Sequence, residues 1–136
     1  MVKKTTANTY TYAIGRRKSA IATVKLFSGK GDLEVNTKPV DKYFPTPSQK
    51  TQYEKPFIVT NTTGKYHFKA KIIGGGKNGQ VEALVLAIAR ALQKLDNTFT
   101  SVLRTSGLLT VDSRVRERRM VGTGGKARRQ KQSPKR

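Results

Sequence analysis

The last stretch of the chain, residues 114–136, is the feature that most limits how this protein can fold. It holds ten Lys or Arg residues and one acidic residue, Glu117. Its apolar side chains are too few to bury the surface that would offset the entropy lost on ordering. The segment is therefore predicted to be an unfolded cationic arm when alone. Such arms order against a polyanion, most commonly nucleic acid, and a solvated tail is the alternative.

The rest of the chain is basic as well. The 136 residues include 28 basic and 8 acidic side chains, a net charge of +20. Residues 114–136 contribute 10 − 1 = +9, which leaves +11 on residues 1–113. Self-repulsion of this size opposes a compact state, so a neutralising partner is expected, and phosphate backbones have the required charge. A general DNA-packing protein is the alternative that charge alone permits, with poor discrimination between duplex DNA and folded RNA.

Several classes of site are excluded by composition. The chain has no Cys, which excludes disulfides, thiolate metal sites and cysteine nucleophiles, and its single histidine, His67, makes a histidine-based zinc site unexpected. No catalytic residues, metal or cofactor are therefore predicted, and the chain is not expected to be an enzyme. Residues 1–12 lack the apolar block of a secretory signal, and the apolar run at 81–92 is too short to span a bilayer. A soluble, intracellular protein without a membrane partner is expected.

Alternating patterns predict the first strands. Residues 1–9 are polar and expected to be disordered. One strand has Tyr10, Tyr12 and Ile14 on one side; the next has small or branched apolar residues at 20, 22, 24 and 26, and a basic turn is predicted between them at residues 15–18. A turn at 28–32, a short strand at 33–35, a helical turn at 40–44 and a short helix at 49–55, ended by Pro56, are expected next.

Residues 65–73 give the clearest strand signal. Tyr66, Phe68, Ala70 and Ile72 point to one side, the core face, whereas His67 and the lysines at 65, 69 and 71 point to the other. Phosphate contact and plain solvation both account for that cationic face. The aromatic residues of the chain are few and are mostly assigned to the core, so recognition of RNA shape and backbone is expected over base readout.

A helix is predicted over residues 78–95. Apolar residues at 81, 84, 85, 88, 92 and 95 form one stripe, Asn78 is a candidate N-cap, and Glu82 is placed in the first turn. A shorter helix at 98–104, ended by Ser106 and Gly107, and a strand at 108–111 follow. The predicted class is mixed α/β (α+β): a small sheet with helices on one face. Residues 10–111 form the domain, and residues 112–136 form the arm, whose start is ordered by Asp112 and Glu117 paired with neighbouring arginines.

Gly74, Gly76 and Gly79 form a G-x-G-x-x-G pattern between a strand and a helix, with Asp96 downstream. This is the spacing of a dinucleotide-binding turn. However, Asp96 follows a helix where that fold needs a strand, and too few residues remain for a doubly wound sheet. A tight strand-to-helix turn explains the glycines. Backbone N–H groups at the helix N-terminus, with Lys77, are also candidates for binding an RNA phosphate.

Four blocks of sequence, taken in order, identify a family resemblance. They are residues 12–24 (YAIGRRKSAIATV), 39–45 (PVDKYFP), 74–92 (GGGKNGQVEALVLAIARAL) and 103–119 (LRTSGLLTVDSRVRERR). From about residue 10 to 136 the chain resembles the small-subunit ribosomal protein nine family, bacterial or organellar type. The resemblance implies a two-layer sandwich with a left-handed βαβ crossover, in a cytoplasmic ribosome or, alternatively, an organellar one.

The resemblance also implies partners and sites. The family binds the 3′ (head) domain of small-subunit ribosomal RNA beside neighbouring proteins of the subunit head, and its arm reaches the peptidyl-site tRNA. On this sequence the tRNA contacts are Lys135 and Arg136. The expected ribosomal RNA contacts are Arg16, Arg17, Lys18, Lys69, Lys71, Lys77, Arg114, Arg116, Arg118, Arg119, Lys126, Arg128, Arg129 and Lys131.

The chain departs from the family pattern at three places. Thr23 stands where the family usually has Arg, and one extra residue lies within residues 122–125. Ser133 and Pro134 occupy the places of a Phe and a Ser before the last Lys-Arg. The missing Phe removes a stacking contact, and Pro134 has no N–H to offer a phosphate. Thr23 leaves the first hairpin one cation short, and the two departures in the tail bear on the reach and contact of the arm more than on its general role.

Overall fold

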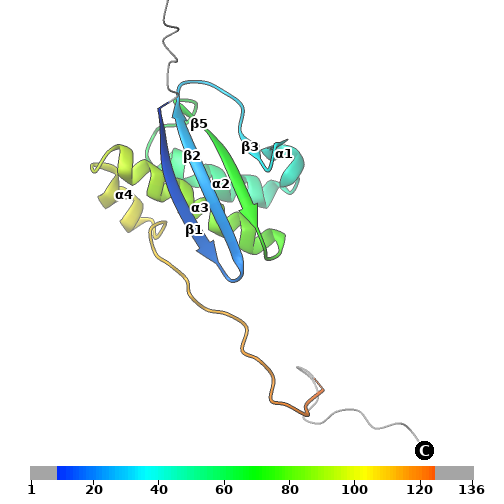
Figure 1. The fold of residues 1–136 in the computed structure, drawn as a ribbon. Coiled ribbons are helices and arrows are strands. Elements are labelled where there is room, and N and C mark those ends of the chain that lie inside the picture. Colours follow the sequence, from blue (N-terminus) through cyan, green and yellow to red (C-terminus); the bar gives the residue numbers. More distant parts are fainter. Residues whose placement is uncertain (1–8, 125–136) are drawn as a thin grey trace, which may run out of the picture.

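The protein is described here by a computed structural model, which covers residues 9–124. Within that range the order of elements is β1 (Tyr10–Arg17), β2 (Ala20–Ser28), β3 (Glu34–Val35), β4 (Lys38–Pro39), α1 (Val40–Tyr43), α2 (Pro47–Val59), β5 (Tyr66–Ile73), α3 (Lys77–Leu95) and α4 (Phe99–Thr105). The helices pack on one face of the sheet (Figure 1). The predicted mixed α+β class is confirmed.

The sheet has the strand order β1-β2-β5-β3-β4. Among the hydrogen-bonded pairs of strands in this sheet, only β3 and β5 are parallel. The chain between these two strands contains α1 and α2, so the connection is a βαβ crossover. The pairing of β1 with β2 extends as far as Arg17 opposite Ala20, so the turn contains only Lys18 and Ser19. Lys18 takes a positive φ of 54° there. The predicted turn at residues 15–18 is therefore wrong, because residues 15–17 continue β1.

Gly15 belongs to β1 because α3 passes directly over it. A Cβ added to Gly15 would lie 2.1 Å from the carbonyl oxygen of Ala83 and 2.6 Å from the amide nitrogen of Ala87. No side chain fits between the two backbones, so the glycine sets how closely α3 can approach the sheet. Its function is packing between β1 and α3 and not the formation of a turn.

Helix α3 lies at the centre of the molecule. The predicted apolar stripe is buried at Val81, Leu84, Ile88 and Leu92, but several alanines outside it are buried as well. The reason is that α3 packs on β1 and β2 on one side and on α2 and α4 on the other. The helix begins at Lys77 with Gly76 as its N-cap and has no acidic residue in its first turn. The predicted Asn78 cap and the first-turn position of Glu82 are wrong.

Helix α2 runs through a proline that was predicted to end it. Pro56 lies inside the helix, which continues to Val59. The cost of the missing N–H is offset by burial of Tyr53, Pro56 and Phe57. The ring of Phe57 stacks on that of Phe68 from β5, with centroids 6.3 Å apart and planes 5° apart. Tertiary packing thus overrides the local signal.

Helix α4 ends as predicted, but the strand expected at 108–111 is absent. Gly107 has a φ of +73°, and its N–H donates to the Arg104 carbonyl. The N–H of Leu108 donates to the Leu103 carbonyl, which completes a Schellman ending. Leu108 is buried by this closure, whereas Val111 is half exposed. The apolar residues close α4 and do not extend the sheet.

A two-residue turn that was not predicted joins β3 to β4. Asn36 and Thr37 both have positive φ, as a two-residue hairpin requires. The Asn36 amide also replaces a strand partner: its Oδ1 accepts the N–H of Ile72 at 2.9 Å, and its Nδ2 donates to the carbonyl of Ile72 at 3.0 Å. One side chain therefore extends the two-residue strand β3 along β5.

Two cations of α3 satisfy the free edge of β1. Arg90 Nη1 donates to the carbonyl of Ile14 at 2.8 Å, and Lys94 Nζ donates to the carbonyl of Tyr12 at 2.6 Å. Edge carbonyls need such partners, and charged side chains beside an edge strand also discourage another strand from pairing there. Part of the basic charge therefore serves the fold itself.

Candidate nucleic-acid interface

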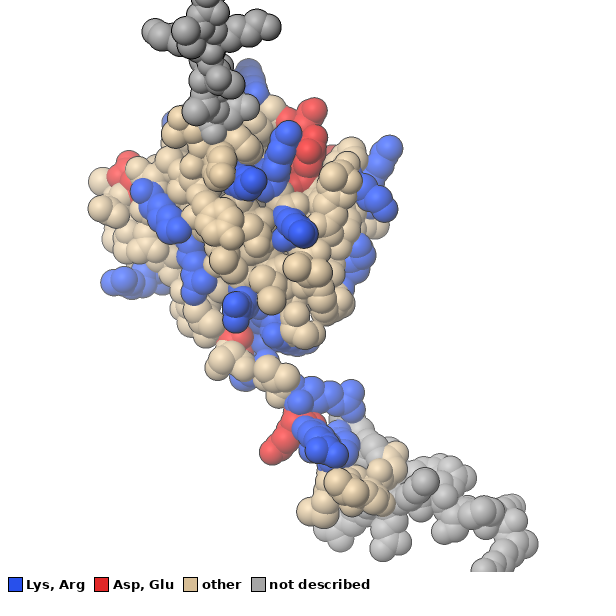
Figure 2. Space-filling view, viewed as in Figure 1, with Lys and Arg blue, Asp and Glu red and all other residues tan. Residues whose placement is uncertain are grey.

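Basic side chains are spread over the sheet side of the molecule. Figure 2 shows Lys and Arg across this face and along the segment that leaves the domain, with few acidic residues between them. Among the predicted ribosomal RNA contacts, Arg16, Lys18, Lys69 and Lys71 are exposed on the domain. The exposed arm cations are Arg114, Arg116, Arg118 and Arg119. The predicted contacts Lys126, Arg128, Arg129, Lys131, Lys135 and Arg136 lie outside the described residues.

Two predicted contacts have partners inside the protein. The ammonium of Lys77 lies 3.3 Å from the ring centroid of Tyr43, a cation–π contact. The side chain of Arg17 is only 13% exposed. Its guanidinium contacts Glu82 at 2.5 Å and donates to the backbone carbonyl of Arg114 at 3.0 Å. Contact of these two side chains with ribosomal RNA remains a prediction, and both have a structural role within the protein.

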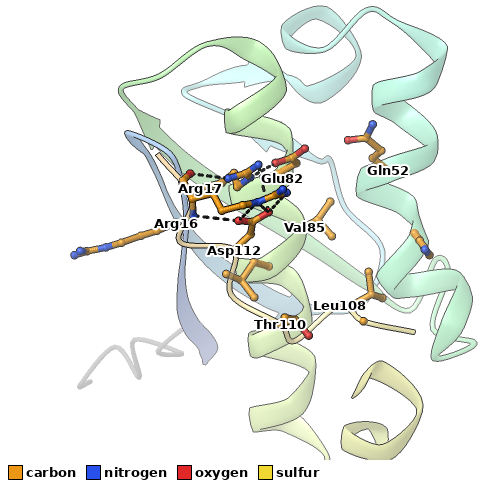
Figure 3. A pocket seen from close by; sticks show the side chains of 12 residues that line it. Arg16, Arg17, Gln52, Glu82, Val85, Leu108, Thr110 and Asp112 are labelled. Atoms are coloured by element: carbon orange, nitrogen blue, oxygen red, sulfur yellow. Dashed lines mark hydrogen bonds and ion pairs between the residues drawn. The ribbon is translucent and has the colours of Figure 1, made fainter. Parts of the chain in front are cut away.

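Arg17, Glu82, Asp112 and Arg114 form one connected group, the arm-exit cluster (Figure 3). Arg17 Nη2 lies 3.3 Å from Asp112 Oδ2. Asp112 also accepts four hydrogen bonds from Arg114: from its Nη2 at 2.8 Å, from its Nε at 3.0 Å to one carboxylate oxygen and 3.2 Å to the other, and from its backbone N–H at 3.1 Å. The cluster joins β1, α3 and the first arm residues. Pairing of Asp112 with an arginine is as predicted, whereas Glu117 forms no ion pair within residues 9–124.

The charge of Asp112 is maintained by this arrangement. The pKa of its carboxyl lies well below the usual value because the Arg114 side chain and backbone N–H both donate to it. The neighbouring guanidinium of Arg17 acts in the same direction. Asp112 is therefore an anion throughout the physiological pH range. The signal that could have revealed Arg17 and Glu82 is long-range, because the two residues lie on different elements.

Beyond the cluster the described chain leaves the domain. Residues 113–122 are exposed, and Figure 1 shows them leading away from the sheet and helices. Even apolar residues are uncovered: Val115 is 69% exposed, and Met120 and Val121 are 80% and 81% exposed. An exposed basic segment with no core of its own has the character predicted for the arm.

A groove runs beside the arm-exit cluster. It has a volume of about 340 Å³, and Figure 3 shows the labelled side chains that line it, from β1, α2, α3 and the chain after α4. Val85, Leu86 and Leu108 supply apolar surface, and Lys55 supplies positive charge, whereas the side chain of Arg16 extends away from the groove. Within residues 9–124 no three His, Asp or Glu side chains gather in a way that could hold a metal ion. In the same residues no helix has the length and apolar character to cross a bilayer.

The glycine-rich loop at residues 74–76 is a tight strand-to-helix turn, as predicted. Gly74 and Gly75 have φ values of +73° and +69°, and a Cβ on Gly74 would lie 2.6 Å from the carbonyl oxygen of Ser19. Gln80 Nε2 donates to the Gly74 carbonyl at 3.0 Å. The loop therefore packs against the β1–β2 turn. Asp96 directly follows α3 and does not end a second parallel strand, so the dinucleotide-binding interpretation is excluded. Binding of an RNA phosphate by this loop remains a prediction.

Most aromatic residues were predicted to lie in the core, and three of them lie elsewhere. Tyr10 and Tyr12 are 47% and 44% exposed, and Phe27 is half-buried. All three lie on the sheet face opposite the helices, because β1 turns Ala13 and Gly15 toward α3. The alternation at Tyr10, Tyr12 and Ile14 was read correctly as a strand. Its small residues on the opposite side were the signal for which face is buried.

Comparison with known proteins decides the family. Residues 15–136 match the sequence model of the family described as Ribosomal protein S9/S16. The chain belongs to the ribosomal protein S9/S16 family. It is 43% identical over 122 residues to the small ribosomal subunit protein uS9 of Dehalococcoides mccartyi, covering 90% of each chain. It is 45% identical over 117 residues to the protein of that name from Methylacidiphilum infernorum, covering 86% of each.

A third relative, the small ribosomal subunit protein uS9 of Rickettsia felis, is 44% identical over 125 residues, covering 92% of this chain and 77% of the relative. These relatives are bacterial, and the resemblance to the ribosomal protein S9 family found in the sequence is confirmed. The coarse function follows from membership: the chain is a ribosomal protein of the small subunit, a structural constituent of the ribosome. Members of the family are structural proteins and not enzymes.

Proposed function

We propose that this protein binds the 3′ (head) domain of small-subunit ribosomal RNA and extends residues 112–136 toward the peptidyl-site tRNA. Residues 10–111 form the folded body that is fixed on the RNA. Lysine and arginine side chains displace counterions from the phosphates, and the entropy of counterion release drives binding. The partners are this RNA, the tRNA and neighbouring proteins of the subunit head, in a ribosome of the bacterial cytoplasm.

The arm-exit cluster is the observation that supports the proposal most strongly. An arm that must reach a distant site needs a fixed starting point, and Arg17 holds the chain at Asp112 and at the carbonyl of Arg114. Arg114 is itself exposed, and directly after it come three more exposed arginines: Arg116, Arg118 and Arg119. Arginine suits bidentate contact with phosphate. The cluster therefore aims a cationic segment away from the domain.

The remaining sites are assigned within this proposal. Arg16 and Lys18, at the exposed end of the β1–β2 hairpin, contact ribosomal RNA, as do Lys69, Lys71 and the arm cations Lys126, Arg128, Arg129 and Lys131. Lys135 and Arg136 contact the backbone of the tRNA anticodon stem-loop. Arg17 acts mainly by positioning the arm, and Lys77 supports the loop before α3 through Tyr43.

Sedimentation of a tagged full-length chain in native lysate tests the proposal. We expect the protein to migrate with the small subunit and to remain there after a high-salt wash, because its contacts are specific as well as electrostatic. Binding only to chromosomal DNA, or release as free protein by moderate salt, would contradict specific binding to ribosomal RNA. The first of these results would favour the DNA-packing alternative.

A further inference from the structure

The face of the sheet turned away from the helices carries rings and cations on neighbouring strands. We call it the open sheet face; no helix covers it in Figure 1, and Figure 2 views it directly. The registers of β1, β2 and β5 place its side chains in four rows. The rows are Tyr10–Phe27–His67, Tyr12–Lys25–Lys69, Ile14–Thr23–Lys71 and Arg16–Ile21–Ile73.

One end of the open sheet face is aromatic. The rings of Phe27 and His67 stack with centroids 5.2 Å apart and planes 12° apart, and the Tyr10 ring lies 5.7 Å from that of Phe27. Tyr12 follows in the next row of β1 and is nearly as exposed as Tyr10. Exposed rings held by a sheet offer π surfaces at fixed positions, on which unpaired bases can stack.

Cations lie next to these rings in an arrangement that is costly without a partner. Lys25 and Lys69 are directly opposite each other on β2 and β5, and like charges so placed destabilise a sheet. The nearest acid, Glu34, approaches Lys69 at 3.9 Å. Lys25 also lies 5.0 Å from the ring centroid of Tyr10. A bound polyanion would remove the repulsion between the lysines.

A shallow groove adjoins the lysines. Its volume is about 530 Å³, and three cations, Lys25, Lys69 and Lys71, line it together with one acid, Glu34, and the β3–β4 turn at residues 36–37. Residues alternate along a strand, so successive rows are about 7 Å apart. The rings and the groove therefore form one continuous surface, with stacking positions at one end and positive charge beside them.

We propose that the open sheet face binds a single-stranded segment of RNA, with bases stacked on Tyr10 and Tyr12 and phosphates held by Lys25, Lys69 and Lys71. The proposal rests on the proposed function and adds a second mode of contact to the arm. An apolar protein surface is a poorer occupant, because it would bury Lys25 and Lys71, which form no ion pair within residues 9–124, and would leave Lys69 with only its 3.9 Å contact to Glu34. Duplex RNA is poorer too, because its bases are not free to stack on side chains.

The stacking is tested with the full-length chain and two labelled probes: a 12-nucleotide oligoadenylate and a 12-base-pair RNA duplex. The double variant Tyr10→Ala/Tyr12→Ala should lose oligoadenylate affinity by about fivefold or more for each stacked base, while duplex affinity changes less than twofold. The matched variant Tyr10→Phe/Tyr12→Phe retains the rings and should bind like the parent. Equal losses for both probes, or no loss for oligoadenylate, would overturn the proposal.

The lysines are tested by salt dependence. Lys25→Gln/Lys69→Gln/Lys71→Gln should lower the slope of log affinity for oligoadenylate against log salt by about 2, since each phosphate contact on a single strand contributes about 0.7. The control removes the same charge from the helical side, at Lys42, Lys50 and Lys55. Equal slopes for the two triple variants would contradict the proposal. Sedimentation of the parent chain with the small subunit is independent of this result, so the two failures are distinguishable.

Discussion

Arg17 and Asp112 meet at 3.3 Å between Nη2 and Oδ2, although one ends β1 and the other begins the arm. The contact determines where the arm leaves the domain. Arg17 is held in turn by Glu82 of α3 and reaches the carbonyl of Arg114. Since all residues from 113 to 122 are exposed, this cluster is the last fixed point before the arm.

Removing the Arg17 guanidinium should loosen the arm without unfolding the domain. In Arg17→Gln, residues 113–116 lose their link to β1 and α3, so we expect their backbone order parameters to fall below about 0.6, the range of flexible segments. Global stability should change little, because the two acidic partners, Glu82 and Asp112, are 48% and 35% exposed and stay solvated without Arg17. Nuclear magnetic relaxation of the labelled full-length chain measures both the arm and the domain. Glu117→Gln, which removes an acid without an ion pair in residues 9–124, is the control and should leave the order parameters unchanged.

Acid should release the arm only at low pH. The pKa of Asp112 is lowered in the folded protein by donors from Arg114, so the anion is favoured in the folded state. Such a group contributes fully above its unfolded pKa of about 3.9, and the contribution is lost as pH falls through the lower folded value. Order parameters of residues 113–116 should stay constant from pH 8 to 5 and fall only below about pH 3.9. A change near neutral pH would contradict this assignment.

Two glycines on facing elements should respond in opposite ways to the same change. Gly15→Ala inserts a methyl group against the backbone of Ala83 and Ala87, so the free energy of unfolding should fall by about 1–3 kcal/mol or more. Gly79→Ala meets its nearest atom, the Arg17 carbonyl oxygen, at an ordinary 3.5 Å and should gain up to about 1 kcal/mol from helix propensity. Urea unfolding of the two variants measures the difference. Equal effects would mean that Gly15 is not a close-packing site.

Asn36 should be needed to hold β3 on the sheet. Asn36→Ala removes both hydrogen bonds to Ile72 and places alanine at a φ of +49°, so we expect the free energy of unfolding to fall by about 1–3 kcal/mol. Hydrogen exchange at the Ile72 amide, which donates to Asn36 Oδ1, should accelerate. Asn36→Asp keeps the acceptor but loses the donor, so its exchange rate at Ile72 should lie between those of the parent and Asn36→Ala. Unchanged exchange at Ile72 in Asn36→Ala would show that the bond contributes nothing.

Periodic patterns were sufficient to predict most of the elements. Strand β5 and helix α3 carry long, regular signals, and both lie within two residues of their predicted limits. The failures occur where a distant element decides the outcome. Gly15 and Pro56 are residues that commonly end a strand or a helix. Gly15 nevertheless continues β1, because α3 packs so closely there that no side chain fits. Helix α2 continues past Pro56, because Pro56 and Phe57 are buried. Local sequence contains neither contact.

The residues of the candidate site likewise fall into those that local sequence predicts and those that depend on distant contacts. The basic residues of the arm and of β5 follow directly from composition and alternation. The internal roles of Arg17 and Lys77 do not, because they depend on Asp112 and Tyr43, which come from other parts of the chain. The open aromatic face could have been inferred from the small residues at Ala13 and Gly15, which mark the buried side of β1.

The most direct test of the account is the rate at which peptidyl-site tRNA dissociates from small subunits that carry this chain. A chain that ends at Pro134 lacks Lys135 and Arg136; Lys3→Gln/Lys4→Gln removes the same charge from the other terminus. We expect the shortened chain to assemble normally and to release tRNA severalfold faster, while the control matches the parent. Equal dissociation rates for all three would contradict the claim that the arm contacts the tRNA.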